Sequence, residues 1–283
     1  MTTKRARTIT TINGKRVSNA KARVSVFDNS LLYAEGLFET FLACDNRVLY
    51  LKLHLDRLYK GAAVIDLKPP VGRRQLTEWM RKTLEAHPDR INKLRLTMTS
   101  GEAERWTGVP GKPQVILSAA PHTLPLQPFR VQVSDWRVDQ DSKFRRIKTI
   151  SYAVHAAALK RAKIEGFDDA LMLNKKRQVA EITTANIFWC HRGRIYTPPI
   201  TAGCLEGVTR QVVMREARKL GLRIIEKNES LDRLVEADEI FLSSSLKLVL
   251  GISEISYGRR RFFFEPGEIT HTLAKHIRHL SRI

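Results

Sequence analysis

Apolar and polar side chains alternate along several short stretches of the first 120 residues, as in β-strands with one buried face. The alternation is strictest from Leu94 to Thr99, and residues 114–118 read as its partner strand. Residues 8–12 precede Asn13-Gly14, a dipeptide typical of a two-residue hairpin turn. A further strand is expected over residues 37–42, so we predict a sheet in this part of the chain.

Two stretches between these strands repeat their apolar residues every three to four positions, which predicts amphipathic helices. The first covers residues 51–65, and the second ends near His87-Pro88. In the first helix, His54 and Arg57 fall off the apolar stripe. We therefore expect both side chains to point away from the core.

Two stretches rich in proline or glycine show neither period. The loop over residues 101–113 carries Arg105 and Trp106, which are candidates for substrate specificity because such residues tend to lie on loops. Residues 121–128 contain three prolines, which cannot continue a helix or a central strand. We predict that this second stretch is an interdomain linker.

The pattern thus predicts an N-terminal α/β domain over residues 1–120, the linker over 121–128, and a C-terminal domain over 129–283. In the second domain we expect an alanine-rich helix over residues 151–166. Short strands are expected over residues 129–133, 170–173, 178–180, 185–190, 194–197 and 240–242, and further helices over 208–220, 231–237 and from 268 onward. The fold class is α+β.

Composition adds limits on function. The chain has 283 residues, 43% of them hydrophobic, so it can bury a sizeable core. Neither an apolar run of bilayer length nor an apolar segment after the first residues is present, which favours a cytoplasmic protein without a membrane partner. The three cysteines lack metal-ligand spacing, so no metal site is expected.

The formal net charge of +20 raises nucleic acid as a partner. The basic residues are spread over every segment, however, and runs such as 175–177 and 259–261 fall at expected turns. A solvated basic surface is therefore favoured, and we expect no nucleic-acid partner.

Three stretches carry residues suited to one kind of chemistry. Lys148 precedes the alanine-rich helix, Glu181 stands at a strand end, and Gly207-Val208-Thr209 opens another helix. An amine, a carboxylate and the backbone donors of a helix start are what pyridoxal 5′-phosphate needs at its aldehyde, its ring nitrogen and its phosphate.

The order of these stretches resembles the class IV aminotransferase family, the fold-type IV pyridoxal-phosphate enzymes. The segment from Lys148 to Tyr152 is similar to the family's Lys-x-x-Asn-Tyr, with Ser151 in place of asparagine. The resemblance implies that Lys148 forms the Schiff base with the cofactor and that Tyr152 lies near the cofactor's phenolic oxygen. As an ordinary core aromatic, Tyr152 would have no such role.

The segment from Glu181 to Phe188 is similar to the family's Glu-Gly-x-x-x-Asn-Ile-Phe, except that Ile182 replaces glycine. The resemblance implies that Glu181 contacts the pyridine nitrogen and keeps it protonated, so that the ring withdraws electrons. Ile182 is expected to narrow the pocket on one side. Asn186 is expected to be structural.

For the phosphate, the resemblance implies contacts from Arg57, Val208, Thr209 and Ser245. Residues 207–210 are similar to the family's Gly-Ile-Thr-Arg, and Ser245 stands where a threonine is usual. By spacing alone, Arg57 would be a surface charge. Leu246 and Lys247 replace the small residues usual after Ser245, a change that bears on substrate fit.

For the substrate, the resemblance implies contacts from the Tyr33 segment and from Arg95. Ala34 stands where glycine is usual. Alternation places Arg95 opposite the apolar face of its strand, toward either a pocket or water. In D-amino-acid aminotransferases a strand ends in Thr-Arg-Gly, whereas this chain has Thr99-Ser100-Gly101, which argues against that subgroup.

The resemblance further implies a fold-type IV architecture, in which a small N-terminal α/β domain is followed by a larger domain with a mixed, β-barrel-like sheet, and a homodimer. The expected reaction is transfer of an amino group between an amino acid, branched-chain-like, and a 2-oxo acid. The alternative is aminodeoxychorismate lyase activity, giving 4-aminobenzoate and pyruvate, because residues 186–189 look like the lyases. A third possibility is a basic nucleic-acid-binding protein that has lost catalysis; the intact set of Lys148, Glu181 and Arg57 argues against it.

Overall fold

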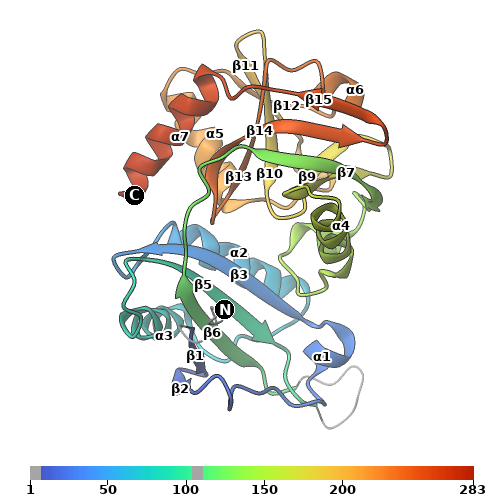
Figure 1. The fold of residues 1–283 in the computed structure, drawn as a ribbon. Coiled ribbons are helices and arrows are strands. Elements are labelled where there is room, and N and C mark those ends of the chain that lie inside the picture. The colour runs from blue at the N-terminus through green and yellow to red at the C-terminus, as the bar shows by residue number, and fades with distance from the viewer. Residues whose placement is uncertain (1–7, 104–110) are drawn as a thin grey trace. The chain divides into compact units, whose positions relative to one another are not determined.

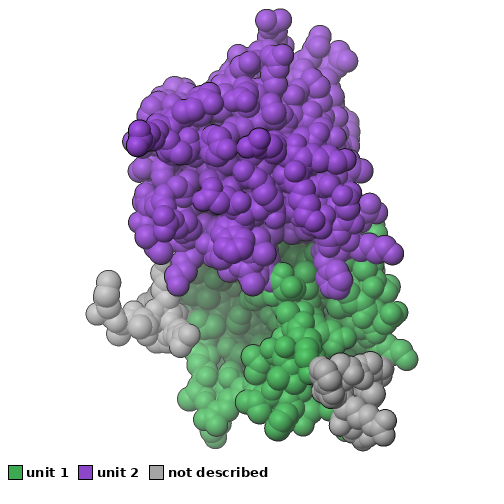
Figure 2. Space-filling model, turned by 90° about the vertical axis from the view of Figure 1, so that its right-hand side faces the viewer, with its two compact units in different colours: residues 1–123, 147–151 green, residues 124–146, 152–283 purple. Residues whose placement is uncertain are grey.

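The computed structural model describes residues 8–103 and 111–283. The chain divides into two compact units, coloured separately in Figure 2. Unit 1 comprises residues 1–123 and 147–151, and unit 2 comprises residues 124–146 and 152–283. Arg105 and Trp106 lie outside the described residues.

Unit 1 contains a six-stranded sheet with the order β2-β1-β6-β5-β3-β4, in which every neighbouring pair is antiparallel (Figure 1). Its strands are β1 (Ile9–Ile12), β2 (Lys15–Val17), β3 (Gly36–Cys44), β4 (Arg47–Val48), β5 (Ile91–Thr99) and β6 (Gln114–Pro121). Asn13 and Gly14 turn β1 into β2 with φ angles of 48° and 76°, as in a type I′ turn. The predicted hairpin and the predicted pairing of residues 94–99 with 114–118 are confirmed.

Unit 1 also has α1 (Asn29–Tyr33), α2 (Leu51–Val64) and α3 (Arg73–Glu85). The apolar faces of α2 and α3 pack with alternate residues of β3, β5 and β6 into one core. The prediction that His54 and Arg57 point away from this core is wrong: their side chains are 1% and 10% exposed. Both turn inward because Glu39, on the helix-facing side of β3, accepts their hydrogen bonds.

Residues 147–151 belong with unit 1, which differs from the predicted domain limits. The Phe38 N–H donates to the Lys148 carbonyl at 2.9 Å, and the Ile150 N–H donates to the Gly36 carbonyl at 3.0 Å. Ile147 is buried in the unit 1 core. This short segment therefore adds to the edge of β3 although it is more than a hundred residues away in the sequence.

Unit 2 is built on a nine-stranded mixed sheet with the order β12-β11-β10-β13-β14-β7-β8-β9, where β15 also pairs with β14. The pairs β7–β8, β7–β14 and β11–β12 are parallel. The strands are β7 (Phe129–Val138), β8 (Asp169–Asn174), β9 (Val179–Ile182), β10 (Asn186–His191), β11 (Arg194–Thr197), β12 (Ile224–Glu226), β13 (Glu239–Ser244), β14 (Leu248–Tyr257) and β15 (Arg260–Phe263). The sequence pattern missed β12, β14 and β15.

The helices of unit 2 are α4 (Ala153–Ile164), α5 (Val208–Lys219), α6 (Leu231–Leu234) and α7 (Glu268–Ser281), with short 3-10 turns at Lys143–Arg146 and Ile200–Ala202. Ile182 is fully buried in the core of this unit with Leu171 and Ile187. Its side chain therefore fills the core, which corrects the expectation that it narrows a pocket. Within the described part of the chain, no helix combines the length and the hydropathy needed to cross a bilayer.

Candidate active site

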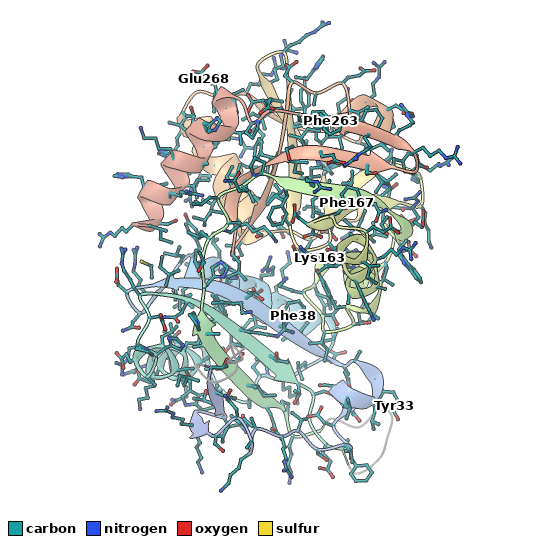
Figure 3. The ribbon with its side chains drawn as sticks, viewed as in Figure 1. Tyr33, Phe38, Lys163, Phe167, Phe263 and Glu268 are labelled. Atoms are coloured by element: carbon teal, nitrogen blue, oxygen red, sulfur yellow. The ribbon has the colours of Figure 1, made fainter. Side chains whose placement is uncertain are left out.

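Lys148 lies on the segment that pairs with β3, beside the aromatic ring of Phe38. Its Nζ is 4.3 Å from the centroid of that ring, and the guanidinium carbon of Arg95 is 4.1 Å from the same centroid. Figure 3 labels Phe38 on its strand. The two cations predicted at different places in the sequence thus meet at one ring in unit 1.

Arg95 reaches Phe38 because of the register of β5 with β3. Arg95 pairs with Thr40, and Phe38 pairs with Thr97, so all four side chains share the face opposite the helices. Leu94 and the other alternate residues of β5 fill the core on the helix side. The sequence leaves open whether Arg95 faces a pocket or water. In the structure its side chain is half-buried and lies over the Phe38 ring.

Arg57 is held on the helix-facing side of the same sheet by a buried carboxylate. Its Nε and Nη2 donate to the two oxygens of Glu39 at 2.8 and 2.7 Å, and His54 Nδ1 lies 2.7 Å from Oε2. Burial alone would raise the pKa of Glu39, but the charges of Arg57 and His54 hold that pKa far below its ordinary value. Burial lowers the pKa of His54, the charge of Glu39 and its hydrogen bond oppose this, and Arg57 and Lys148 lower the pKa further.

Tyr33 ends α1 and is half-exposed, and it is labelled in Figure 3. The next residue, Ala34, adopts a left-handed conformation with φ 55° and ψ 30° and caps the helix through its N–H. Glycine adopts this conformation without steric cost, whereas alanine does not. Ala34, which stands where the family has glycine, is therefore less favourable at this position.

Glu181 lies on β9 in unit 2 and is 5% exposed. Arg145 Nη2 and His155 Nε2 both donate to Oε1, the latter at 3.0 Å, while the Leu205 N–H donates to Oε2 at 2.9 Å. Burial would raise the pKa of Glu181, but Arg145, His155 and the backbone donor lower it below its ordinary value. The group is therefore a buried carboxylate rather than the solvent-facing glutamate that a strand end alone would favour.

Three donors leave acceptor capacity on this carboxylate, since two carboxylate oxygens offer about four lone-pair sites. The sequence reasoning did not single out Arg145 or His155. Arg145 sits in a 3-10 turn outside the motifs. His155 lies three residues after Tyr152, a helical spacing that could have signalled a shared face with it.

Tyr152 stacks on His155 with ring centroids 4.8 Å apart. Its hydroxyl donates to the carbonyl of Thr183, in the turn that follows Glu181. The aromatic ring is thus tied to the Glu181 region from the start of α4.

The start of α5 has the features of an anion site. Gly207 is its N-cap, and no described side chain caps the helix there, so the first N–H groups remain available. The Thr209 hydroxyl is buried and finds no hydrogen-bond partner among the described residues. A Cβ on Gly207 would come within 1.9 Å of Asn186 Oδ1, and Asn186 Nδ2 donates to the Leu205 carbonyl at 2.8 Å. Asn186 is therefore structural, as predicted.

Ser245 lies in the turn between β13 and β14, which also belongs to unit 2. Before it, the hydroxyls of Ser243 and Ser244 are buried without a partner in the part of the chain that the structure describes. The motif reasoning named only Ser245 in this run of serines.

These residues fit pyridoxal 5′-phosphate. The start of the twelve-residue helix α5, together with the buried Thr209 hydroxyl that has no described partner, suits a dianionic phosphate. The charged Glu181 suits a protonated ring nitrogen. The structure groups Lys148, Arg57, Arg95 and Tyr33 in unit 1, and Glu181, Tyr152, Val208, Thr209 and Ser245 in unit 2.

The sequence profile of the family described as amino-transferase class IV matches residues 36–255. A putative branched-chain-amino-acid aminotransferase of Methanocaldococcus jannaschii is 32% identical over 271 residues, which are 93% of this chain and 92% of that protein. Aminodeoxychorismate lyase of Bacillus subtilis is 28% identical over 93% of this chain and 91% of that protein. The crystal structure of a branched-chain aminotransferase from Thermoproteus uzoniensis with norvaline matches with a TM-score of 0.88 and 29% identity, covering 96% of this chain and 94% of that one. The chain belongs to the class IV aminotransferase family, an enzyme family with the fold-type IV architecture.

Proposed function

We propose that this enzyme is a pyridoxal-phosphate-dependent aminotransferase that acts on branched-chain-like amino acids and 2-oxo acids. The observation that carries the proposal is Glu181, a buried carboxylate kept charged by Arg145, His155 and a backbone N–H. These donors stabilise the buried charge, and the lone-pair site that they leave on the carboxylate suits the N–H of a protonated pyridine nitrogen.

When bound, pyridoxal 5′-phosphate supplies an aldehyde for amines and a ring that accepts electrons. Lys148 would supply the amine that holds the aldehyde carbon of the cofactor, and its free amine would take the proton from the substrate α-carbon. Glu181 would hold the proton on the ring nitrogen.

The N–H groups of Val208 and Thr209, the Thr209 hydroxyl and Ser245 would hold the phosphate, and Arg57 would supply a cation for it, as the family resemblance implies. Tyr152 would lie near the phenolic oxygen of the cofactor, as the family resemblance implies.

Tyr33 and Arg95 are proposed to contact the substrate. The half-buried Arg95 supplies a fixed cation for a carboxylate, because the Phe38 ring supports its guanidinium. Branched-chain specificity is supported by several relatives that are named branched-chain-amino-acid aminotransferases.

Lyase activity is a second candidate, favoured by two observations. The Bacillus subtilis relative carries that name. The strand Asn186-Ile187-Phe188-Trp189 resembles the lyases. In that reaction the same Lys148 and Glu181 would serve, and the substrate would lose its β-substituent in place of exchanging its amino group.

A homodimer is supported by an exposed apolar patch in unit 1, in and before α1. Its members are Val26, Phe27, Leu31, Leu32 and Tyr33, which are 46–64% exposed. Contiguous exposed apolar side chains of this kind mark protein contacts.

The test mixes purified enzyme, loaded with pyridoxal 5′-phosphate, with a panel of L- and D-amino acids. Conversion of the visible spectrum to the amine form by branched-chain L-amino acids, with no pyruvate released from aminodeoxychorismate, supports the proposal. Release of pyruvate without amine formation would instead establish the lyase. The Lys148→Ala variant is the control. A retained yellow adduct that hydride can reduce, with undiminished turnover, would overturn the role of Lys148.

A further inference from the structure

Lys247 lies in a tight turn of unit 2, next to a residue whose backbone conformation is unfavourable. Ser244 on β13 pairs with Leu248 on β14, so residues 245–247 form the whole connection. The Lys247 N–H reaches the Ser244 carbonyl at 3.3 Å. Leu248, which follows, has φ 55°, a left-handed conformation that is unfavourable for leucine. Contacts outside the turn have to hold this geometry.

The Lys247 side chain supplies such a contact, because it crosses to a different turn. Its Nζ donates to Thr184 Oγ1 at 2.6 Å and lies 3.9 Å from Asp169 Oδ2. The Thr184 hydroxyl in turn donates to Asp169, and so does the hydroxyl of Thr183. The Asp169 carboxylate, at the start of β8, thus binds the turn after β9 directly and the turn after β13 through Lys247.

This ion pair is largely removed from water. The side chains of Lys247 and Asp169 are 16% and 2% exposed. Burial lowers the pKa of Lys247, Asp169 opposes this, and Lys163 on α4, labelled in Figure 3, lowers the pKa further. The ring of Phe129 covers the ammonium at 5.3 Å. A buried cation with so few partners is a costly device for an ordinary surface turn.

Both turns that Lys247 joins carry residues of the proposed site. Ser245 lies two positions before Lys247. Glu181 lies two positions before Thr183, whose carbonyl also accepts the Tyr152 hydroxyl. We propose that Lys247 is a positioning residue: by bonding Thr184 beside Asp169, it sets the Ser245 turn relative to the Glu181 turn and thereby tightens binding of pyridoxal 5′-phosphate. This inference rests on the proposed function.

The test measures the dissociation constant of pyridoxal 5′-phosphate for the apoprotein, together with the apoprotein melting temperature. Lys247→Met is expected to weaken cofactor binding about tenfold, the loss typical of a charged hydrogen bond. Lys247→Arg, which keeps a cation that can bond Thr184, is expected to restore most of the affinity. Lys163→Met is the matched control, since it removes a neighbouring cation but leaves the bond to Thr184, and it should stay within twofold of wild type.

A double-mutant cycle separates positioning from general destabilisation. Thr184→Val alone should weaken binding about as much as Lys247→Met, and the double variant should be little worse than either single one. Affinity within twofold of wild type for Lys247→Met, or full additivity with Thr184→Val, would overturn the inference. If Lys247→Met does not fold, Thr184→Val and Lys247→Arg carry the comparison. Failure of the wild-type chain to bind the cofactor at all would refute the proposed function itself.

Discussion

Arg57 on α2 grips Glu39 on β3 with two parallel hydrogen bonds, Nε to Oε1 at 2.8 Å and Nη2 to Oε2 at 2.7 Å. The carboxylate is fully buried, and His54 completes its shell. This planar pairing fixes the guanidinium in one orientation before any ligand arrives. The residue proposed for the phosphate is therefore also a structural pin between helix and sheet.

Replacing Glu39 with glutamine should destabilise the protein by about 2 to 3 kcal/mol at pH 7, because a buried Arg57 loses its counter-charge. The pKa of Glu39 is depressed in the folded state, so its stabilisation is fully present above the unfolded pKa of roughly 4.3 and is lost as pH falls toward the folded value. Urea unfolding at pH 7 and at pH 3.5 should show the gap between variant and wild type narrowing in acid. A gap that is constant with pH would contradict this account. Glu85→Gln, on the exposed side of α3, is the control and should change little.

Ala34→Gly should stabilise the protein by about 1 kcal/mol, since glycine adopts the left-handed conformation of residue 34 without steric cost. Thermal unfolding measures the change. Ala158→Gly serves as the opposite control, because Ala158 is buried inside α4, where glycine costs about 1 kcal/mol. If both variants were less stable than wild type, the left-handed backbone of Ala34 would not limit the stability of the protein.

Gly207→Ala should weaken binding of pyridoxal 5′-phosphate by roughly tenfold or more, because the added methyl group displaces Asn186 from the Leu205 carbonyl and disturbs the start of α5. Spectroscopic titration of the apoprotein provides the measurement. Gly72→Ala is the matched control: it also replaces a helix N-cap glycine, but its Cβ would meet no described atom within 4 Å. Equal affinities for the two variants would rule out the steric argument.

Glu181→Gln should lower kcat by on the order of a hundredfold or more, while the visible absorbance of the cofactor joined to Lys148 remains. The amide has nearly the same shape but cannot keep the ring nitrogen protonated. Steady-state turnover and the absorption spectrum are measured on the same preparation. Loss of the spectrum together with turnover would mean that Glu181 is needed to bind the cofactor and not only to tune it.

Local patterns predicted the elements well where the signal is local. The Asn13-Gly14 turn, the alternation of residues 94–99 and the apolar stripe of α2 all hold in the structure. The same logic misread His54, because a stripe of apolar residues cannot reveal a buried carboxylate on a strand that lies before the helix in the chain.

Non-local pairing explains what else the sequence did not provide. Residues 147–151 have no strand pattern of their own and are ordered by the edge of β3. Arg145 and Lys247 reach their partners, Glu181 and Thr184, across turns more than thirty residues apart in the sequence. The family motifs identify the residues proposed to contact the cofactor. Only the structure identifies the groups that set their charge and position, such as Arg145 and Lys247.

The return of residues 147–151 to unit 1 has a consequence for biosynthesis. A ribosome that has delivered the first 123 residues has not yet delivered a complete first unit, which must await the arrival of residue 151. A recombination event with one breakpoint would likewise separate the edge of β3 from the segment that completes it. Lys148 and the sheet that it joins are therefore encoded on both sides of the first segment of unit 2. Unit 1 cannot be replaced by exchanging a single N-terminal stretch of the chain.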